Sequence, residues 1–171
     1  MKLYFSGFCL ENESELFEEY LIQNDYTLSG FSFGAIQALE FALHSAALDI
    51  RIDLIQLFSP SFFNDKDEKY KRMQLIYFKK NSQQYCDNFL KNSGFAEEKS
   101  EKYFQMGKYE ELNELLNYKW DQNKLQMLIN NGTKIEVYLG EKDKIIDSQK
   151  ALEFFVNFSE VYFIKNKGHI L

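Results

Sequence analysis

A serine lies between two glycines where a strand pattern gives way to a helix pattern, in Gly30-Phe31-Ser32-Phe33-Gly34. A serine on so sharp a turn has a strained backbone, and a Cβ two residues before or after it would clash. The turn also places the serine at a helix N-terminus, where free N–H groups favour an oxyanion. We therefore predict that Ser32 is a nucleophile for acyl transfer.

A serine nucleophile needs a base, and the chain contains two histidines. His44 lies twelve residues beyond Ser32 on the same predicted helix. That spacing is about 18 Å along the axis, so we expect His44 on a helix face without a catalytic role. His169 follows the last predicted strand, where a parallel sheet offers its catalytic loops. We predict that His169 is the base.

The acid that orients the histidine is expected after the preceding strand, in the chain order serine, acid, histidine. Asp143 follows the predicted strand end by three residues and is our choice to hold the imidazole tautomer. Glu141 is a rival for the same role. Asp147 precedes a predicted helix at Ser148, so we expect it to be a helix N-cap.

Acyl transfer also needs donors for the tetrahedral oxyanion. The backbone N–H of Phe33, directly after the nucleophile, is the first expected donor. The second is expected from the loop after the first predicted strand, Ser6-Gly7-Phe8, with the N–H of Phe8 as the candidate. Gly7 is equally compatible with an ordinary turn after a strand.

The composition of the chain argues against several classes of function. The chain has 171 residues and a net charge of −6, with no block of basic residues comparable to a DNA-binding arm, which argues against nucleic acid as a partner. No apolar run approaches a membrane span and no signal sequence is visible, so we expect a cytoplasmic protein without membrane contact. Cys9 and Cys86 fit neither a disulfide framework nor a metal site, and we expect both to be packing residues. The glycine loop lacks the further glycine and the acidic residue of a dinucleotide site.

Strand and helix patterns alternate along the chain. This alternation predicts an α/β fold, with a mostly parallel sheet of about five strands, right-handed crossovers and helices on both faces. The predicted strands cover residues 2–8, where the strand breaks at Gly7, and residues 26–30, 52–60, 134–140 and 160–166. The helices between them cover residues 11–22, 33–47 and 148–158.

The stretch 61–131 departs from this alternation, because it consists of charged and aromatic helical patterns without a strand. We interpret it as an all-helical cap subdomain inserted between two strands of one domain that spans residues 1–171. Its aromatic residues are candidates for a slot that takes an acyl chain, although helical aromatic stripes also serve as core. They are Phe62, Phe63, Tyr77, Phe78, Phe89, Phe104 and Trp120.

With the serine motif, Gly140-Glu141-Lys142-Asp143 and Gly168-His169 in this order, the chain resembles an abbreviated α/β-hydrolase. Its length, its start on Leu3-Tyr4-Phe5-Ser6-Gly7-Phe8 and its end shortly after the histidine look like the BioV-type pimeloyl-ACP methyl ester esterases of biotin synthesis. That resemblance implies hydrolysis of the methyl ester to pimeloyl-ACP and methanol. It implies a Ser32, His169 and Asp143 triad and no cofactor or metal.

An acyl carrier protein is acidic, so an enzyme of net negative charge must meet it with a local basic surface. Residues 66–80 contain six basic and two acidic side chains, which makes this the most basic window of the chain. We expect Lys69, Lys71, Arg72 and Lys79 to dock the carrier protein. The same charges also fit an ordinary solvated helix face.

Two other functions remain compatible with these residues. The same triad and oxyanion donors serve an acyl-thioesterase or a general short-chain carboxylesterase, because only the pocket distinguishes these substrates. A catalytically silent binding module with a hydrolase fold is the alternative from a different class.

Overall fold

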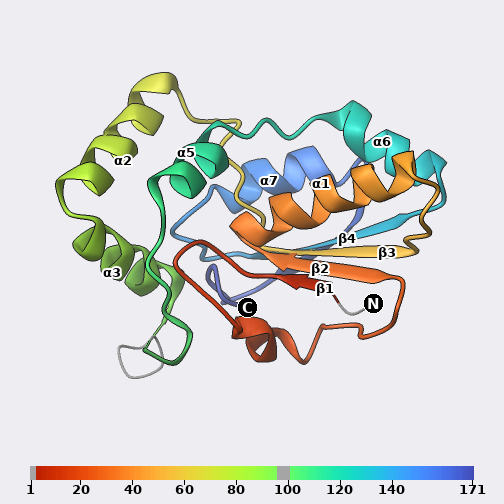
Figure 1. Ribbon diagram of the computed structural model, residues 1–171, viewed down its shortest axis with the longest axis horizontal. Coiled ribbons are helices and arrows are strands. Elements are labelled where there is room, and N and C mark those ends of the chain that lie inside the picture. Colours follow the sequence, from red (N-terminus) through yellow and green to blue (C-terminus); the bar gives the residue numbers. More distant parts are fainter. Residues whose placement is uncertain (1–2, 96–100) are drawn as a thin grey trace.

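Parallel strands form one sheet, in which they lie side by side in the order in which they occur in the chain (Figure 1). The computed structural model describes residues 3–95 and 101–171. Within these residues every neighbouring strand pair of the sheet is parallel, which confirms the predicted α/β class. The strands are β1 (Leu3–Phe5), β2 (Thr27–Phe31), β3 (Leu54–Phe58), β4 (Lys134–Gly140) and β5 (Glu160–Ile164).

The helices that connect neighbouring strands share one face of the sheet, contrary to the expectation of helices on both faces. They are α1 (Phe33–Ala47), α6 (Gln122–Asn130) and α7 (Ser148–Phe155). Helix α1 contacts β1, β2 and β3, α6 contacts α1 and β4, and α7 contacts β4 and β5 (Figure 1). From β2 to β5 each strand is added on the same side of the previous one, so right-handed crossovers all pass over the same face.

The opposite face of the sheet is covered by the segment between β1 and β2. The helix predicted over 11–22 is here only a short 3-10 helix, η1 (Glu13–Phe17). Asn12 before it has a left-handed φ of 58°, and the Glu13 side chain turns inward, so no continuous amphipathic helix forms. The fully buried Phe17 ring packs on Phe31 and Phe58, with ring centroids 4.9 and 4.8 Å apart.

Strands β2 and β3 are buried along their whole length, because this segment covers one face and α1 covers the other. Their side chains alternate between the two faces, so Leu28 and Ile55 lie on the opposite side of the sheet from Phe31 and Phe58. The catalytic candidates follow the carboxyl ends of these and the neighbouring strands, where loops from all five strands meet at one edge.

Helices from the stretch between β3 and β4 stand beyond this edge of the sheet (Figure 1). They are α2 (Glu68–Lys80), α3 (Ser82–Ser93) and α5 (Tyr109–Asn117), and α2 contacts both of the others. We interpret them as the cap, whereas α6, at the end of the stretch 61–131, lies along the sheet. In the described part of the chain, no helix has the length and apolar character needed to cross a lipid bilayer.

The cap is joined to the sheet at a pair of buried thiols. Cys9, in the loop after β1, and Cys86, on α3, are both free, and their Sγ atoms lie 2.7 Å apart. Burial raises the pKa of the Cys9 thiol, which keeps it protonated. Both cysteines are therefore packing residues, as their lack of a motif predicts.

Candidate active site

Ser32 lies at the turn between β2 and α1 with φ 54° and ψ −112°, a backbone conformation that L residues rarely adopt. The flanking glycines make this turn possible. A Cβ on Gly30 would lie 2.1 Å from the carbonyl oxygen of Gly34, and one on Gly34 would lie 1.9 Å from that of Phe5. The turn is thus the strained elbow predicted from the glycine spacing, and it packs directly against the end of β1.

The structure brings the three residues of the expected triad into one hydrogen-bonded line. His169 Nε2 lies 2.9 Å from Ser32 Oγ, and His169 Nδ1 lies 2.7 Å from Asp143 Oδ2. Ser32 is 1% exposed, and the side chains of His169 and Asp143 are fully buried. This arrangement can transfer a proton from the serine to the histidine in a site shielded from bulk water.

The partners of Asp143 determine which ring nitrogen carries the proton. Its Oδ1 accepts the backbone N–H groups of Ile145 and Ile146, at 2.7 and 3.1 Å, so the loop itself fixes the carboxylate. An ionised carboxylate only accepts hydrogen bonds, so His169 Nδ1 must donate to it. Nε2 then presents its lone pair to the Ser32 hydroxyl, as a general base requires.

Close backbone contacts position the histidine loop. A Cβ on Gly140, at the end of β4, would lie 1.9 Å from the carbonyl oxygen of Gly168, so only glycine permits this approach. The N–H of Lys142 donates to the carbonyl of Lys167 at 2.7 Å. On the other side, the N–H of Ile170 donates to the carbonyl of Ser93 at the end of α3, at 3.1 Å. The cap therefore helps to hold His169.

The other candidates for the base and the acid occupy different positions. Asp147 accepts the N–H of Lys150 and caps α7, as predicted. Glu141 accepts the backbone N–H of Asn166 at 3.1 Å and is exposed. His44 lies in the last turn of α1 and is exposed.

A second serine in the site has no counterpart in the sequence prediction. Ser61 Oγ lies 3.1 Å from Ser32 Oγ, and Ser61 is 1% exposed. Because Ser32 donates its proton to His169, Ser61 is left to donate to Ser32 Oγ. The Ser61 loop is held by its own N–H, which donates to the Ser32 carbonyl, and by Trp120 Nε1, which donates to the Ser61 carbonyl at 2.9 Å. Its only sequence signal is its place just after β3, the strand next to the nucleophile strand.

The two predicted oxyanion donors come from different parts of the chain: Phe33 directly follows Ser32, and Phe8 belongs to the loop after β1. The N–H of Phe33 belongs to the first turn of α1 and has no acceptor within the helix. The Phe8 loop is held by the fully buried Glu13, whose Oε1 accepts the N–H of Gly7 at 2.8 Å and the Tyr4 hydroxyl at 3.1 Å. Glu13 Oε2 has no hydrogen-bond partner among the described residues. In the sequence, Glu13 is only one of several acidic residues in the segment 11–22 that is predicted to be helical.

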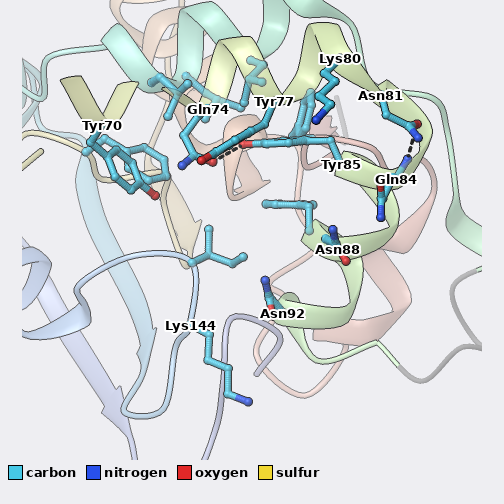
Figure 2. A pocket seen from close by; sticks show the side chains of 17 residues that line it. Tyr70, Gln74, Tyr77, Lys80, Asn81, Gln84, Tyr85, Asn88, Asn92 and Lys144 are labelled. Atoms are coloured by element: carbon cyan, nitrogen blue, oxygen red, sulfur yellow. Dashed lines mark hydrogen bonds between the residues drawn. The ribbon is translucent and has the colours of Figure 1, made fainter. Parts of the chain in front are cut away.

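A cavity of about 610 Å³ lies next to the triad, between the cap helices and the loop after β4 (Figure 2). One layer of side chains separates it from the catalytic residues. Phe89 lines the cavity, and its ring centroid lies 6.2 Å from that of His169. Ile145 also lines it and donates its N–H to Asp143. Of the seven cap aromatics proposed for an acyl slot, Phe63, Tyr77 and Phe89 line this cavity.

The four cap residues expected to dock a carrier protein do not share one environment. Lys69, Arg72 and Lys79 are exposed on α2, and Lys79 Nζ lies 4.4 Å from the centre of the Tyr109 ring. Lys71 is 6% exposed and contacts Glu68, with 3.7 Å between Nζ and Oε1. The helix repeat turns Lys71 away from Arg72 and into the interior of the cap. Lys71 is therefore not one of the residues that could dock a carrier protein.

Among the described residues, no group of His, Cys, Asp and Glu side chains gathers into a metal site.

The sequence matches no family model and no curated protein. Its fold matches solved hydrolase structures. A carboxylesterase of the ammonia-oxidizing thaumarchaeon Nitrososphaera gargenis matches 84% of this chain at 18% identity, with a TM-score of 0.57. BioG from Haemophilus influenzae matches 99% at 15% identity and E-2-(acetamidomethylene)succinate hydrolase 99% at 10% identity, each with a TM-score of 0.60.

The share of each neighbour that is matched differs. The chain covers 57% of the carboxylesterase, 88% of BioG and 84% of the succinate hydrolase. The parallel sheet, the strained serine turn and these matches together show that the chain has the α/β-hydrolase fold.

Proposed function

We propose that this protein is a serine ester hydrolase. The observation that carries the proposal is the hydrogen-bonded line from Ser32 through His169 to Asp143 at the strained turn after β2. A nucleophile on such a turn, a neutral imidazole at hydrogen-bond distance and a buried carboxylate behind it are the parts that acyl transfer needs.

In the first half of the reaction, His169 Nε2 takes the proton of Ser32 as Oγ attacks the ester carbonyl carbon. The negative charge moves to the carbonyl oxygen, and in this proposal the N–H groups of Phe33 and Phe8 donate hydrogen bonds to it. The alkoxide of the alcohol then leaves with the proton from His169, and an acyl group remains on Ser32.

In the second half, water replaces the alcohol. His169 takes a proton from the water as its oxygen attacks the acyl carbon, and the same oxyanion donors receive the charge. Collapse of this intermediate returns the proton from His169 to Ser32 Oγ and releases the carboxylic acid. Asp143 keeps its proton-accepting contact with Nδ1 throughout, and so stabilises the imidazolium that forms in each half.

As substrate we propose the methyl ester of pimeloyl-ACP, which yields pimeloyl-ACP and methanol. The resemblance to BioV-type esterases supports this choice, and so does the small size shared with BioG, 88% of which the chain covers. A cavity of about 610 Å³ offers ample room for a seven-carbon chain. The aromatic side chains that form part of its lining suit methylene groups.

The acidic carrier protein is proposed to dock on the exposed basic face of α2. Lys69, Arg72 and Lys79 lie within about 80° of one another around the helix axis, at 3.6 residues per turn. This face adjoins Lys80, which lines the cavity. We propose that a chain attached to a carrier held here enters the cavity beside Lys80.

Methanol release from pimeloyl-ACP methyl ester tests the proposal, with Ser32→Ala and His169→Ala as controls. We expect turnover by the wild type and a loss of at least about 10³-fold in each variant. Release of free carrier thiol instead of methanol would identify a thioesterase. Turnover of short esters alone would identify a general carboxylesterase, and no turnover of any ester by folded protein would favour the silent binding module.

A further inference from the structure

One wall of the cavity is formed by a row of carboxamide side chains on α3. Gln84, Asn88 and Asn92 follow one another at intervals of four residues, and they lie along one side of the helix in Figure 2. Asn81, which caps α3 through its Oδ1, extends the row at its outer end. All four residues are exposed and line the cavity.

The row spans the distance from the triad to the outer end of the cap. Asn92 precedes Ser93, whose carbonyl accepts the N–H of Ile170, the residue after His169. Asn81 joins α3 to α2 and follows Lys80. Asn81 and Asn92 are eleven positions apart along α3, which corresponds to about 16 Å. The row therefore leads from the catalytic residues to the basic face of α2.

The charged residues that line the cavity indicate which class of ligand it can bind. The cavity-lining residues that the structure describes include two lysines, Lys80 and Lys144, and no carboxylate. This contrasts with the net charge of −6 of the whole chain. Each Asn or Gln side chain offers one acceptor oxygen and two N–H donors, and so can pair with both halves of a secondary amide. A ligand that is neutral or anionic and carries amide groups along its length fits this wall.

Another part of the cavity lining differs in character. It consists of the apolar side chains of Leu112, Leu115 and Leu116 from α5, together with Phe63. An extended chain in this cavity could bury its methylene groups on the apolar part and satisfy its polar groups on the carboxamide row.

We propose that the α3 carboxamide row binds an extended, amide-bearing arm attached to the acyl group, of the pantetheine type, with Gln84 and Asn88 as its main contacts. This inference rests on the proposed function, because the arm is the part of the substrate that joins the acyl chain to its carrier. The arm runs outward along α3 and leaves the cavity beside Lys80, next to the docking residue Lys79.

Binding to a Ser32→Ala background tests the row without requiring turnover. The probes are the pantetheine thioester of monomethyl pimelate and dimethyl pimelate, which has no amide, with affinities measured by calorimetry. Gln84→Met combined with Asn88→Leu keeps the side-chain size but removes the amides. We expect about tenfold weaker binding of the pantetheine probe, from the loss of two or more hydrogen bonds, and unchanged binding of dimethyl pimelate.

Gln83→Met is the matched control, because Gln83 lies next to Gln84 on α3, is exposed, bonds to Asp87 and does not line the cavity. It should bind both probes like the parent protein. Equal affinity of the double variant and its parent for the pantetheine probe would overturn the proposal, as would equal weakening for both probes. The proposed function is tested separately. If it is wrong, protein that retains Ser32 will release no methanol from pimeloyl-ACP methyl ester.

Discussion

His169 Nε2 lies 2.9 Å from Ser32 Oγ across 137 positions of sequence. The parallel sheet makes this contact possible, because β2 and β5 deliver their following loops to the same edge. Ser61 completes the surroundings of the nucleophile from the loop after β3. Ser32 Oγ therefore contacts a base, His169, and a hydroxyl donor, Ser61. We expect the loss of either contact to slow the reaction.

Removal of the Ser61 hydroxyl should slow the reaction without changing substrate affinity. In Ser61→Ala the hydrogen bond to Ser32 Oγ is lost, and we expect kcat to fall about tenfold. Ser59→Ala is the matched control, because the Ser59 hydroxyl is buried two residues away and has no partner among the described residues. Steady-state kinetics on a small ester measure both variants. An unchanged kcat in Ser61→Ala would contradict the assigned role.

Glu13 is expected to act as a positioning residue for the oxyanion loop. Glu13→Ala removes the acceptor of the Gly7 N–H, so the neighbouring N–H of Phe8 is no longer held in place. We expect kcat to fall by about 10-fold to 100-fold with little change in KM. Glu13→Gln keeps an acceptor oxygen and should recover most of the activity. Equal losses in both variants would show that the charge of Glu13, not its acceptor, matters.

Charge reversal on α2 tests the docking surface. Arg72→Glu with Lys79→Glu should raise KM for a carrier-linked ester about tenfold at low salt, and leave a small ester unaffected. Added salt should reduce the difference. The control is Lys119→Glu with Lys150→Glu, which changes the net charge equally at exposed positions outside the cavity lining. An equal effect in the two double variants would exclude a local docking surface.

Alkaline conditions should weaken the fold in part through Tyr118. Burial and the hydrogen bond from its hydroxyl to Glu40 raise the pKa of Tyr118 well above its usual value. Above about pH 10 the unfolded chain loses this proton while the folded chain keeps it, so the free energy of unfolding falls as the pH rises. Urea midpoints at pH 8.5 and 10.5 should therefore differ less in Tyr118→Phe than in the wild type. Tyr26→Phe, at a ring that is 45% exposed, should behave like the wild type.

Local patterns account for the parts of the molecule that were predictable. The glycines beside Ser32 reflect contacts within a few residues of sequence, so their spacing alone indicates the turn. The five strands are short apolar runs bounded by turn residues, and each was expected close to its observed place. The chain order serine, acid, histidine then indicates Asp143 and His169 as the partners of Ser32. Each of the three residues follows a predicted strand, and parallel strands end at the same edge of the sheet.

Features that depend on packing between distant segments were not predictable in this way. Ser61 and Glu13 are ordinary polar residues in sequence, and only the fold brings one to Ser32 and the other to Gly7. Lys71 looks like its exposed neighbours, but the packing of α2 in the cap buries it. The single helical face of the sheet depends on strand order, which alternation of strands and helices leaves open.

The most direct test of the central claim is the labelling of the native protein with a fluorophosphonate, followed by mapping of the modified residue by mass spectrometry. The probe reacts with a serine only when a base activates it. We predict one modified residue, Ser32, and loss of labelling in a folded His169→Ala variant. Absence of labelling in the folded wild type, or labelling that persists without His169, would contradict the proposed catalytic line.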